Sequence, residues 1–160
     1  MSKTISPFSK EQLLPQEETL ELSRKKGDLF IGLPKETSYQ EKRVCLTPDA
    51  VASLVSQGHR ILIEANAGSA SGFTDRDYSE AGAEITNDTK KVFSCPIILK
   101  IEPPSLAEIA LINPQTLLIS ALQLKTQNKK YFEALAIKKI TALAFEFIKD
   151  HDGTFPAVRV

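Results

Sequence analysis

The sequence predicts an α/β protein built on an open, doubly wound parallel sheet, a flavodoxin-like, Rossmann-related three-layer sandwich. Short apolar runs alternate with capped helical segments from residue 28 onward. Runs such as Ile97, Ile98 and Leu99 show no polar alternation, which is typical of strands buried on both faces of a parallel sheet. This repeated order of strand, helix and strand indicates parallel strands joined by right-handed crossovers.

Each element has its own local signals. The expected strands cover residues 29–33, 60–65, 83–85, 96–100, 116–122 and 140–148. The expected helices cover residues 47–58, 74–82, 87–93, 104–112 and 126–139. The first helix is the best marked, with Thr47 as N-cap, Pro48 at the first helical position and Gly58 as its stop. The inward-facing side chains expected in the last helix are Tyr131, Phe132, Leu135 and Ala136.

Residues 1–27 differ in character from residues 28–160, which form the expected domain. They are polar, contain Pro7 and Pro15, and end in basic residues before Gly27. This pattern predicts an appended N-terminal arm that is helical in its second half. We expect the arm to pack on the body of the domain or on a neighbouring subunit.

The composition is that of a soluble globular domain. The chain has 160 residues, of which 42% are hydrophobic, and its 20 basic and 20 acidic residues cancel. This balance argues against recruitment to nucleic acid or to anionic membranes. No apolar run approaches the roughly 20 residues of a membrane span, and the N-terminus lacks a secretion signal. Cys45 and Cys95 have no metal-binding spacing and are interpreted as reduced thiols of a cytoplasmic protein that binds no metal.

The seven glycines do not form a phosphate-binding loop. Neither GxGxxG nor GxxxxGK[ST] occurs, and the Gly-rich stretch AGSASG at residues 67–72 has neither spacing. We therefore interpret AGSASG as a plain turn and expect no cofactor-binding residues within this chain.

Three polar residues follow or connect strands at the carboxyl edge of the expected sheet, where open α/β sheets bind ligands. Lys100 closes one strand, Gln123 follows another, and Arg43 lies in the long connection after the first strand. If these strands are parallel neighbours, all three side chains reach one crevice. Two cations and an amide suit a small carboxylate: arginine binds two oxygens as a planar fork, and lysine acts as a point charge on a carbonyl or imine.

Each of these residues also has a simpler interpretation. Arg43 in the charged sequence EKR is by default solvated, and Gln123 alone is an ordinary strand-end amide. Lys100 needs more explanation, because an apolar run ends in an ammonium. We expect it to lean into a crevice at the sheet edge rather than to be a buried charge. From the residues alone, the prediction is a domain that binds a small acid.

Several motifs resemble the N-terminal domain of the alanine dehydrogenase and pyridine nucleotide transhydrogenase family. They are GLPKE, RVCLTP, GH, the turn AGSASG, the acidic helix ending AGA, and the stretches IILKIEPP and EIALINPQTLLIS. The resemblance runs from residue 29 to the end of the chain and leaves the arm outside it. It implies that a second, Rossmann-type domain, absent from these residues, follows and binds NAD.

The resemblance also implies roles for the candidate residues. Arg43 matches the arginine that grips the substrate carboxylate, and Lys100 matches the catalytic lysine that contacts the carboxylate or carbonyl. L-Alanine is then oxidised through an imine to pyruvate and ammonia, with hydride transfer to NAD in a cleft between the domains. The full-length protein is expected to form a homo-oligomer, and the isolated fragment to be inactive.

Gln123 departs from the family pattern. Alanine dehydrogenases carry a histidine there as the proposed acid/base, and a glutamine cannot shuttle protons. Proton transfer then falls to Lys100, to water or to the missing domain, or else the substrate is not alanine. Two alternatives stay open: the N-terminal domain of a transhydrogenase α-subunit, which also lacks the histidine, and a non-catalytic module that binds a small acid.

Overall fold

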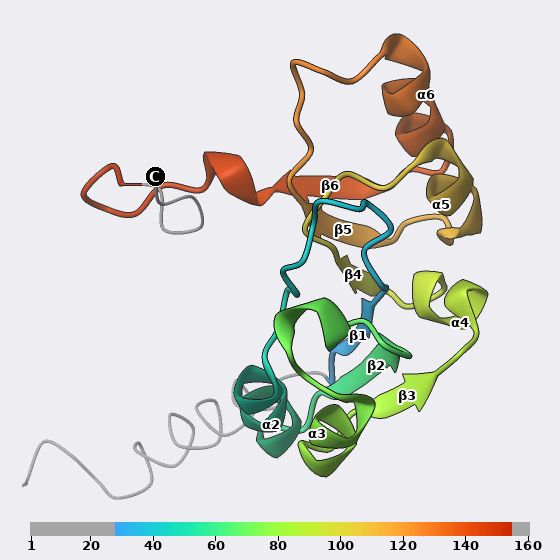
Figure 1. The fold of residues 1–160 in the computed structure, drawn as a ribbon. Coiled ribbons are helices and arrows are strands. Elements are labelled where there is room, and N and C mark those ends of the chain that lie inside the picture. Colours follow the sequence, from blue (N-terminus) through green and yellow to red (C-terminus); the bar gives the residue numbers. More distant parts are fainter. Residues whose placement is uncertain (1–27, 155–160) are drawn as a thin grey trace, which may run out of the picture.

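The computed structural model describes residues 28–154, so the predicted arm at residues 1–27 lies outside the described residues, as do residues 155–160. The described chain folds around one parallel sheet (Figure 1). Its strands are β1 (Phe30–Leu33), β2 (Arg60–Glu64), β3 (Glu84–Thr86), β4 (Ile97–Leu99), β5 (Leu117–Ser120) and β6 (Thr141–Ala144). The strand order β3-β2-β1-β4-β5-β6 is the Rossmann arrangement rather than the flavodoxin one.

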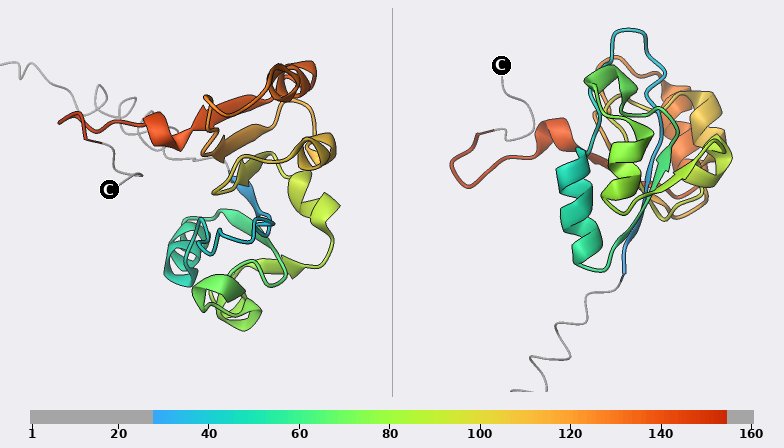
Figure 2. Two further views of the ribbon diagram at one scale, coloured as in Figure 1. Left: turned by 45° about the horizontal axis from the view of Figure 1, so that its top comes forward. Right: turned by 60° about the horizontal axis from the view of Figure 1, so that its bottom comes forward.

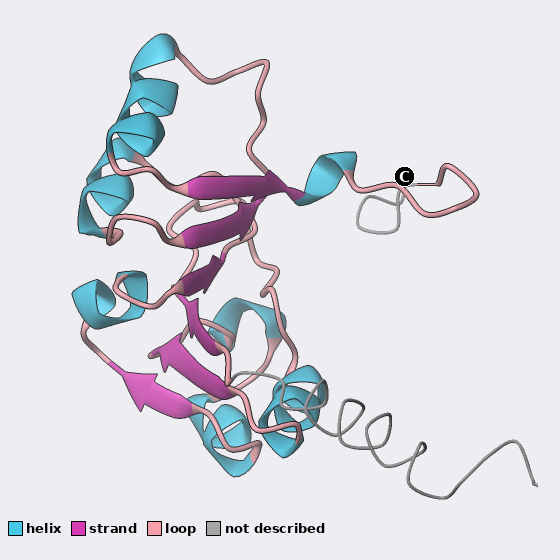
Figure 3. Cartoon of the chain, turned by 180° about the vertical axis from the view of Figure 1, so that it is seen from behind, coloured by secondary structure: helices cyan, strands magenta, loops and turns pink. Residues whose placement is uncertain are grey.

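Helices cover both faces of this sheet, which confirms the predicted three-layer, doubly wound fold. The α-helices are α2 (Pro48–Ser56), α3 (Asp75–Glu80), α4 (Thr89–Phe93), α5 (Leu106–Leu111) and α6 (Lys129–Ile137), and the 3₁₀ turns are η2 (Ser69–Ser71) and η3 (Phe145–Phe147). Helices α2 and α3 lie on one face, and α4, α5 and α6 lie on the other (Figures 2 and 3). The connections from β1 and β4 therefore leave toward opposite faces.

The predicted caps explain where the helices begin. The Thr47 hydroxyl accepts a hydrogen bond from the Ala50 N–H at 3.4 Å, and Pro48 opens α2. Helices α3 and α5 begin with capping boxes, the second formed by Ser105 and Glu108. Because each box fixes the first turn of its helix, these caps also fix where the preceding loops end.

The hydrophobic core divides at the centre of the sheet. One cluster lies under α2 and α3 and includes Val51, Ile61 and Tyr78; the other lies under α5 and α6 and includes Ile98 and Leu118. Strand β2 is buried along its whole apolar run, whereas the outer strand β6 alternates exposed and half-buried residues. The apolar run of β2 therefore matches the prediction of burial on both faces. In β4, for which the prediction was made, Ile98 is buried but Ile97 and Leu99 are half-buried, and β6 does not match.

The inward face predicted for α6 is partly wrong. Tyr131 and Leu135 are buried, but Phe132 is 38% exposed and Ala136 is exposed as well. Helix α6 covers the end of the sheet at β6, so only one stripe of residues spaced by four meets the core. Phe132 instead packs edge-on against the Tyr131 ring, with 5.5 Å between the ring centroids.

Candidate functional site

The charged residues singled out in the sequence gather at the carboxyl edge of the sheet, around the point where β1 and β4 lie side by side. The long connection from β1 to α2 and the short one from β4 to α5 both start there (Figure 1). This is the switch point at which open α/β sheets form their binding crevice.

Lys100 follows β4 directly, and its side chain is buried rather than solvated. Only 2% of the side chain is exposed, so the expectation that it avoids being a buried charge is wrong. Its Nζ donates a hydrogen bond to Glu36 Oε2 at 2.6 Å and lies 3.7 Å from Glu108 Oε1. Two carboxylates thus compensate the removal of the ammonium from water.

Glu36 ties the β1 connection to the end of β4. While Oε2 accepts from Lys100, Oε1 accepts the backbone N–H of Ile101 at 2.6 Å. Both oxygens of this nearly buried carboxylate are therefore used, and they fix where Lys100 lies. Its partner Lys100 is 64 residues away in the sequence, so local spacing does not reveal this pair.

Glu108 has two roles. Its Oε2 closes the α5 capping box by accepting the Ser105 N–H at 2.7 Å, and its Oε1 faces Lys100. The motif Ser-x-x-Glu is the sequence signal that could have identified the capping role. Its second role required knowing that α5 begins beside the end of β4.

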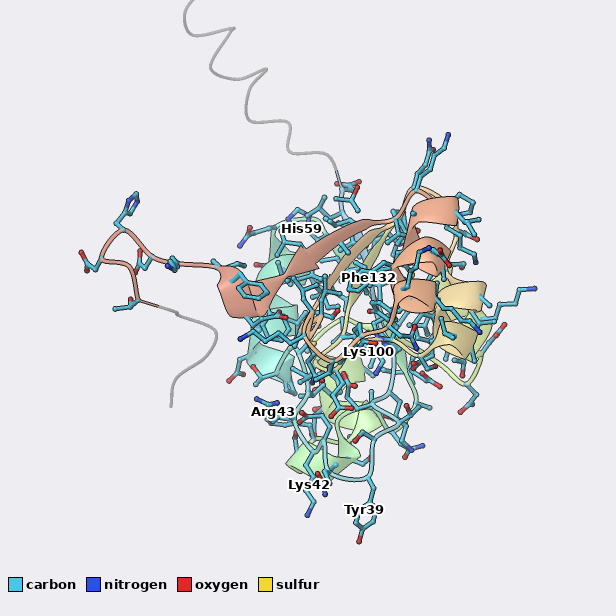
Figure 4. The ribbon with its side chains drawn as sticks, turned by 90° about the horizontal axis from the view of Figure 1, so that it is seen from above. Tyr39, Lys42, Arg43, His59, Lys100 and Phe132 are labelled. Atoms are coloured by element: carbon cyan, nitrogen blue, oxygen red, sulfur yellow. The ribbon has the colours of Figure 1, made fainter. Side chains whose placement is uncertain are left out.

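Arg43 lies in the same connection as Glu36 but near the surface, and 74% of its side chain is exposed. Its Nε and Nη2 donate to the two oxygens of Glu41 at 2.9 and 2.7 Å, which forms a bidentate pair. These hydrogen bonds lower the pKa of Glu41 and raise that of Arg43. In Figure 4, Arg43 and Lys42 lie toward the outside, Tyr39 extends further from the body, and Lys100 is central.

Gln123 lies in a turn after β5 with a left-handed backbone, φ = 47°. Its N–H donates to Glu146 Oε1 at 2.9 Å, and its carbonyl accepts from the Thr126 N–H and hydroxyl, both at 2.9 Å. Glu146 comes from the turn after β6, so a contact between two loops holds this residue in a conformation that glutamine seldom adopts.

The three predicted residues share one edge of the sheet but line separate hollows. Arg43 lines a hollow of about 150 Å³, Lys100 one of about 310 Å³ and Gln123 one of about 290 Å³. A single crevice that all three reach stays a prediction. Arg43 and Lys100 are linked electrostatically, since both act on the Cys45 thiol, whose pKa burial raises to about 12.

The fold and this cluster define an α/β domain of Rossmann strand order whose buried charges gather at the switch point. Residues 32–160 match the family model described as alanine dehydrogenase/PNT, N-terminal domain, and the chain belongs to this family. The match agrees with the resemblance found in the sequence motifs.

Individual relatives are similar over the same region. The chain is 37% identical over 126 residues to an alanine dehydrogenase of Staphylococcus epidermidis and 38% identical over 122 residues to that of Bacillus subtilis, covering 79% and 76% of this chain. It spans about a third of their length, 34% and 32%.

Solved structures give the same result. An L-alanine dehydrogenase superposes with a TM-score of 0.76 at 36% identity, covering 80% of this chain and 35% of that one. A transhydrogenase from Sinorhizobium meliloti superposes with a TM-score of 0.69 at 28% identity, covering 74% and 35%. Within residues 28–154, no helix is long and apolar enough to cross a bilayer.

Proposed function

We propose that this chain supplies the substrate-side, N-terminal domain of an NAD-dependent alanine dehydrogenase. The observation that carries the proposal is the Lys100–Glu36 pair, buried at the switch point of a chain that belongs to the family. NAD is assigned mainly to a second domain, because this sequence contains no glycine-rich phosphate loop. Hydride from the substrate carbon passes to NAD in the cleft between the two domains.

Each site residue has a role in this proposal. Lys100, oriented by Glu36, places its positive charge against the carbonyl or carboxylate of pyruvate and stabilises charge in the transition state. Arg43 binds the substrate carboxylate by releasing Glu41, which now occupies its Nε and Nη2. Gln123 hydrogen-bonds the carbonyl or amino group but cannot move the proton.

The partners follow from the same proposal. The ligand is a small molecule, alanine or pyruvate, and the balanced charge of 20 basic and 20 acidic residues favours neither nucleic acid nor membrane. We place the protein in the cytoplasm as a homo-oligomer of the full-length chain.

The test is alanine-dependent NADH formation by the full-length chain, followed by absorbance. We expect turnover in the wild type and a loss of roughly 100-fold or more in Lys100→Ala, the magnitude typical of a lost transition-state contact. Lys129→Ala is the matched control, because Lys129 also pairs with a glutamate, Glu133, but on the surface. Undiminished turnover in a folded Lys100→Ala variant would refute the catalytic role.

The transhydrogenase is the second candidate, favoured by Gln123 in place of the histidine and by the superposition with the Sinorhizobium meliloti protein. Hydride exchange between NADH and an NADP analogue without any amino acid distinguishes it from an alanine dehydrogenase. A non-catalytic module would show neither activity and still bind pyruvate in a calorimetric titration.

A further inference from the structure

Three buried side-chain oxygens have no hydrogen-bond partner among residues 28–154: Ser120 Oγ, Tyr131 Oη and Glu146 Oε2. Ser120 is fully buried and Tyr131 is 3% exposed. Buried polar atoms in folded proteins nearly always have a partner, because leaving one unpaired costs roughly 1–3 kcal/mol. Finding three of them in one region therefore indicates that something polar binds there.

The three oxygens come from adjacent elements at the same edge of the sheet. Ser120 ends β5 and pairs in register with Ala144 of β6, two residues before Glu146. Side chains alternate along β5, so Ser120 faces the opposite side from Ile119 and the same side as Leu118. Leu118 belongs to the core cluster that also contains Tyr131. Burial raises the pKa of Tyr131 to about 12, and the nearby carboxylates of Glu108 and Glu146 contribute.

Tyr131 is near both parts of the candidate site. With Lys100 and Glu108 it lines the hollow of about 310 Å³. Glu146, whose charge acts on the Tyr131 hydroxyl, accepts the Gln123 N–H with Oε1, and its Oε2 is one of the three unpartnered atoms. A neutral tyrosine hydroxyl, the form of any tyrosine of ordinary or raised pKa at pH 7, can accept and donate a hydrogen bond at once.

We propose that the oxygens of Ser120, Tyr131 and Glu146 bind one internal water, and that this water and the Tyr131 hydroxyl form a proton relay for the reaction at Lys100. A buried water makes about three hydrogen bonds, which is the number of partners that these oxygens offer. The relay supplies the proton transfer that Gln123 cannot provide. Its catalytic part rests on the proposed dehydrogenase function.

The proton balance defines what the relay moves. Zwitterionic alanine, NAD⁺ and water give pyruvate, ammonium, NADH and one proton. We assign the path of that proton from the hollow of about 310 Å³, which the Tyr131 side chain lines, to the buried Tyr131 oxygen, while the original Tyr131 hydrogen passes to the bound water. The water then gives a proton to Glu146, from which it reaches solvent, and each hop breaks one O–H bond and forms another.

Tyr131→Phe in the full-length chain is the decisive variant. We expect kcat for L-alanine to fall about ten-fold or more, within the range of general acid–base contributions. The solvent isotope effect on kcat should rise, with KM within about two-fold. Ser120→Ala, which removes a partner of the water and keeps the tyrosine, should lower kcat by a few-fold and serves if Tyr131→Phe does not fold.

Tyr78→Phe is the matched control. Tyr78 is an equally buried tyrosine, but its hydroxyl already donates to the Leu46 carbonyl at 2.8 Å. We expect that variant to lose thermal stability and keep the wild-type isotope effect. An unchanged kcat and isotope effect in Tyr131→Phe, with an equal or higher Tm, would show that the Tyr131 hydroxyl neither transfers a proton nor binds a water. That result would overturn the relay.

A high-resolution crystal structure of the full-length protein tests the water site without any assay. Ordered density within hydrogen-bond distance of all three oxygens supports the site, and direct protein partners for these oxygens overturn it. If the wild type does not oxidise L-alanine with NAD, the proposed function fails and the catalytic role of the relay fails with it. The density then still decides whether the water site exists.

Discussion

The two ion pairs contributed by the connection between β1 and α2 join similarly buried glutamates to cations in opposite surroundings. Glu36 and Glu41 each have 8% of the side chain exposed, whereas Lys100 is 2% exposed and Arg43 is 74% exposed. The first pair joins residues far apart in the sequence, and the second joins residues two positions apart.

The difference in exposure gives the two cations different roles. A buried pair is fixed, because removing either member leaves a charge without water or a partner. A pair whose cation is exposed contributes less stability, and that cation can exchange partners. Lys100 is therefore held in one position before the substrate binds. Arg43 can release Glu41 and bind the substrate carboxylate instead.

Glu36→Ala should have the largest effect on stability. It leaves the buried Lys100 ammonium with only Glu108 at 3.7 Å, so we expect a loss of about 3–5 kcal/mol in the free energy of unfolding. Denaturant unfolding of the full-length chain measures it. A loss below about 1 kcal/mol would mean that the pair is solvated and that the comparison between the two pairs fails.

The double variant Lys100→Met with Glu36→Leu separates stability from function. Replacing a buried pair by apolar residues of similar volume is often neutral. Here it also leaves the Ile101 N–H and Glu108 Oε1 without their partners, so we expect a loss of roughly 1–3 kcal/mol in the free energy of unfolding, less than for Glu36→Ala. Alanine-dependent NADH formation should still fall roughly 100-fold. Wild-type turnover in this variant would contradict a catalytic role for the pair.

Arg43→Lys tests the exposed member as a carboxylate ligand. Lysine keeps the charge and loses the planar fork, so KM for alanine should rise about ten-fold, equivalent to about 1.4 kcal/mol. Because the side chain is exposed, Tm should change little. Steady-state kinetics measure the first effect and differential scanning fluorimetry the second; an unchanged KM removes Arg43 from the site.

Glu41→Gln should lower stability by about 1 kcal/mol at pH 7, because the carboxylate is 8% exposed while its partner Arg43 is largely in solvent. The folded-state pKa of Glu41 lies below its ordinary value of 4.5, because Arg43 hydrogen-bonds the carboxylate. Its contribution is therefore present above about pH 4.5 and is lost as the pH falls through the lower folded value. Wild type and variant should converge in acid, and a difference that grows in acid would reverse the sign.

The pKa of the Cys45 thiol depends on the charges of both ion pairs. We expect this thiol to show the smallest of the predicted effects. Its pKa is raised to about 12 chiefly by burial, and Glu36 and Glu41 raise it further while Lys100 and Arg43 lower it. The thiol is protonated at pH 8, so iodoacetamide should modify the folded protein far more slowly than free cysteine. The unfolded thiol ionises near pH 9, so this group's contribution to stability declines as the pH rises from about 9 toward 12. Rapid alkylation of the folded protein would show that the Cys45 thiol is accessible to solvent.

Local signals in the sequence were enough to predict most of the fold. Caps at Thr47, Thr74 and Ser105, and uninterrupted aliphatic runs in the central strands, located the elements and indicated a doubly wound sheet. The prediction that Phe132 faces inward was wrong for a physical reason. Helical periodicity shows that a face is apolar, but the width of its buried stripe depends on what the helix covers.

The site was less predictable because its contacts are long-range. The apolar run that ends in Lys100 indicated that this lysine needs a special explanation. The explanation is its burial against Glu36, which depends on β1 and β4 being neighbours in the sheet. Tyr131 and Glu146 were missed because nothing near them in sequence signals an unpartnered oxygen. The one readable signal was the Ser105-x-x-Glu108 capping box, which placed Glu108 at the start of α5.

The most direct test of the central claim is a structure of the full-length protein with pyruvate bound. We predict that Lys100 Nζ lies within about 3.2 Å of a pyruvate oxygen while keeping its hydrogen bond to Glu36. We also predict that Arg43 has exchanged Glu41 for the carboxylate. Pyruvate bound away from the β1–β4 switch point, with Lys100 contacting only Glu36 and Glu108, would contradict the account.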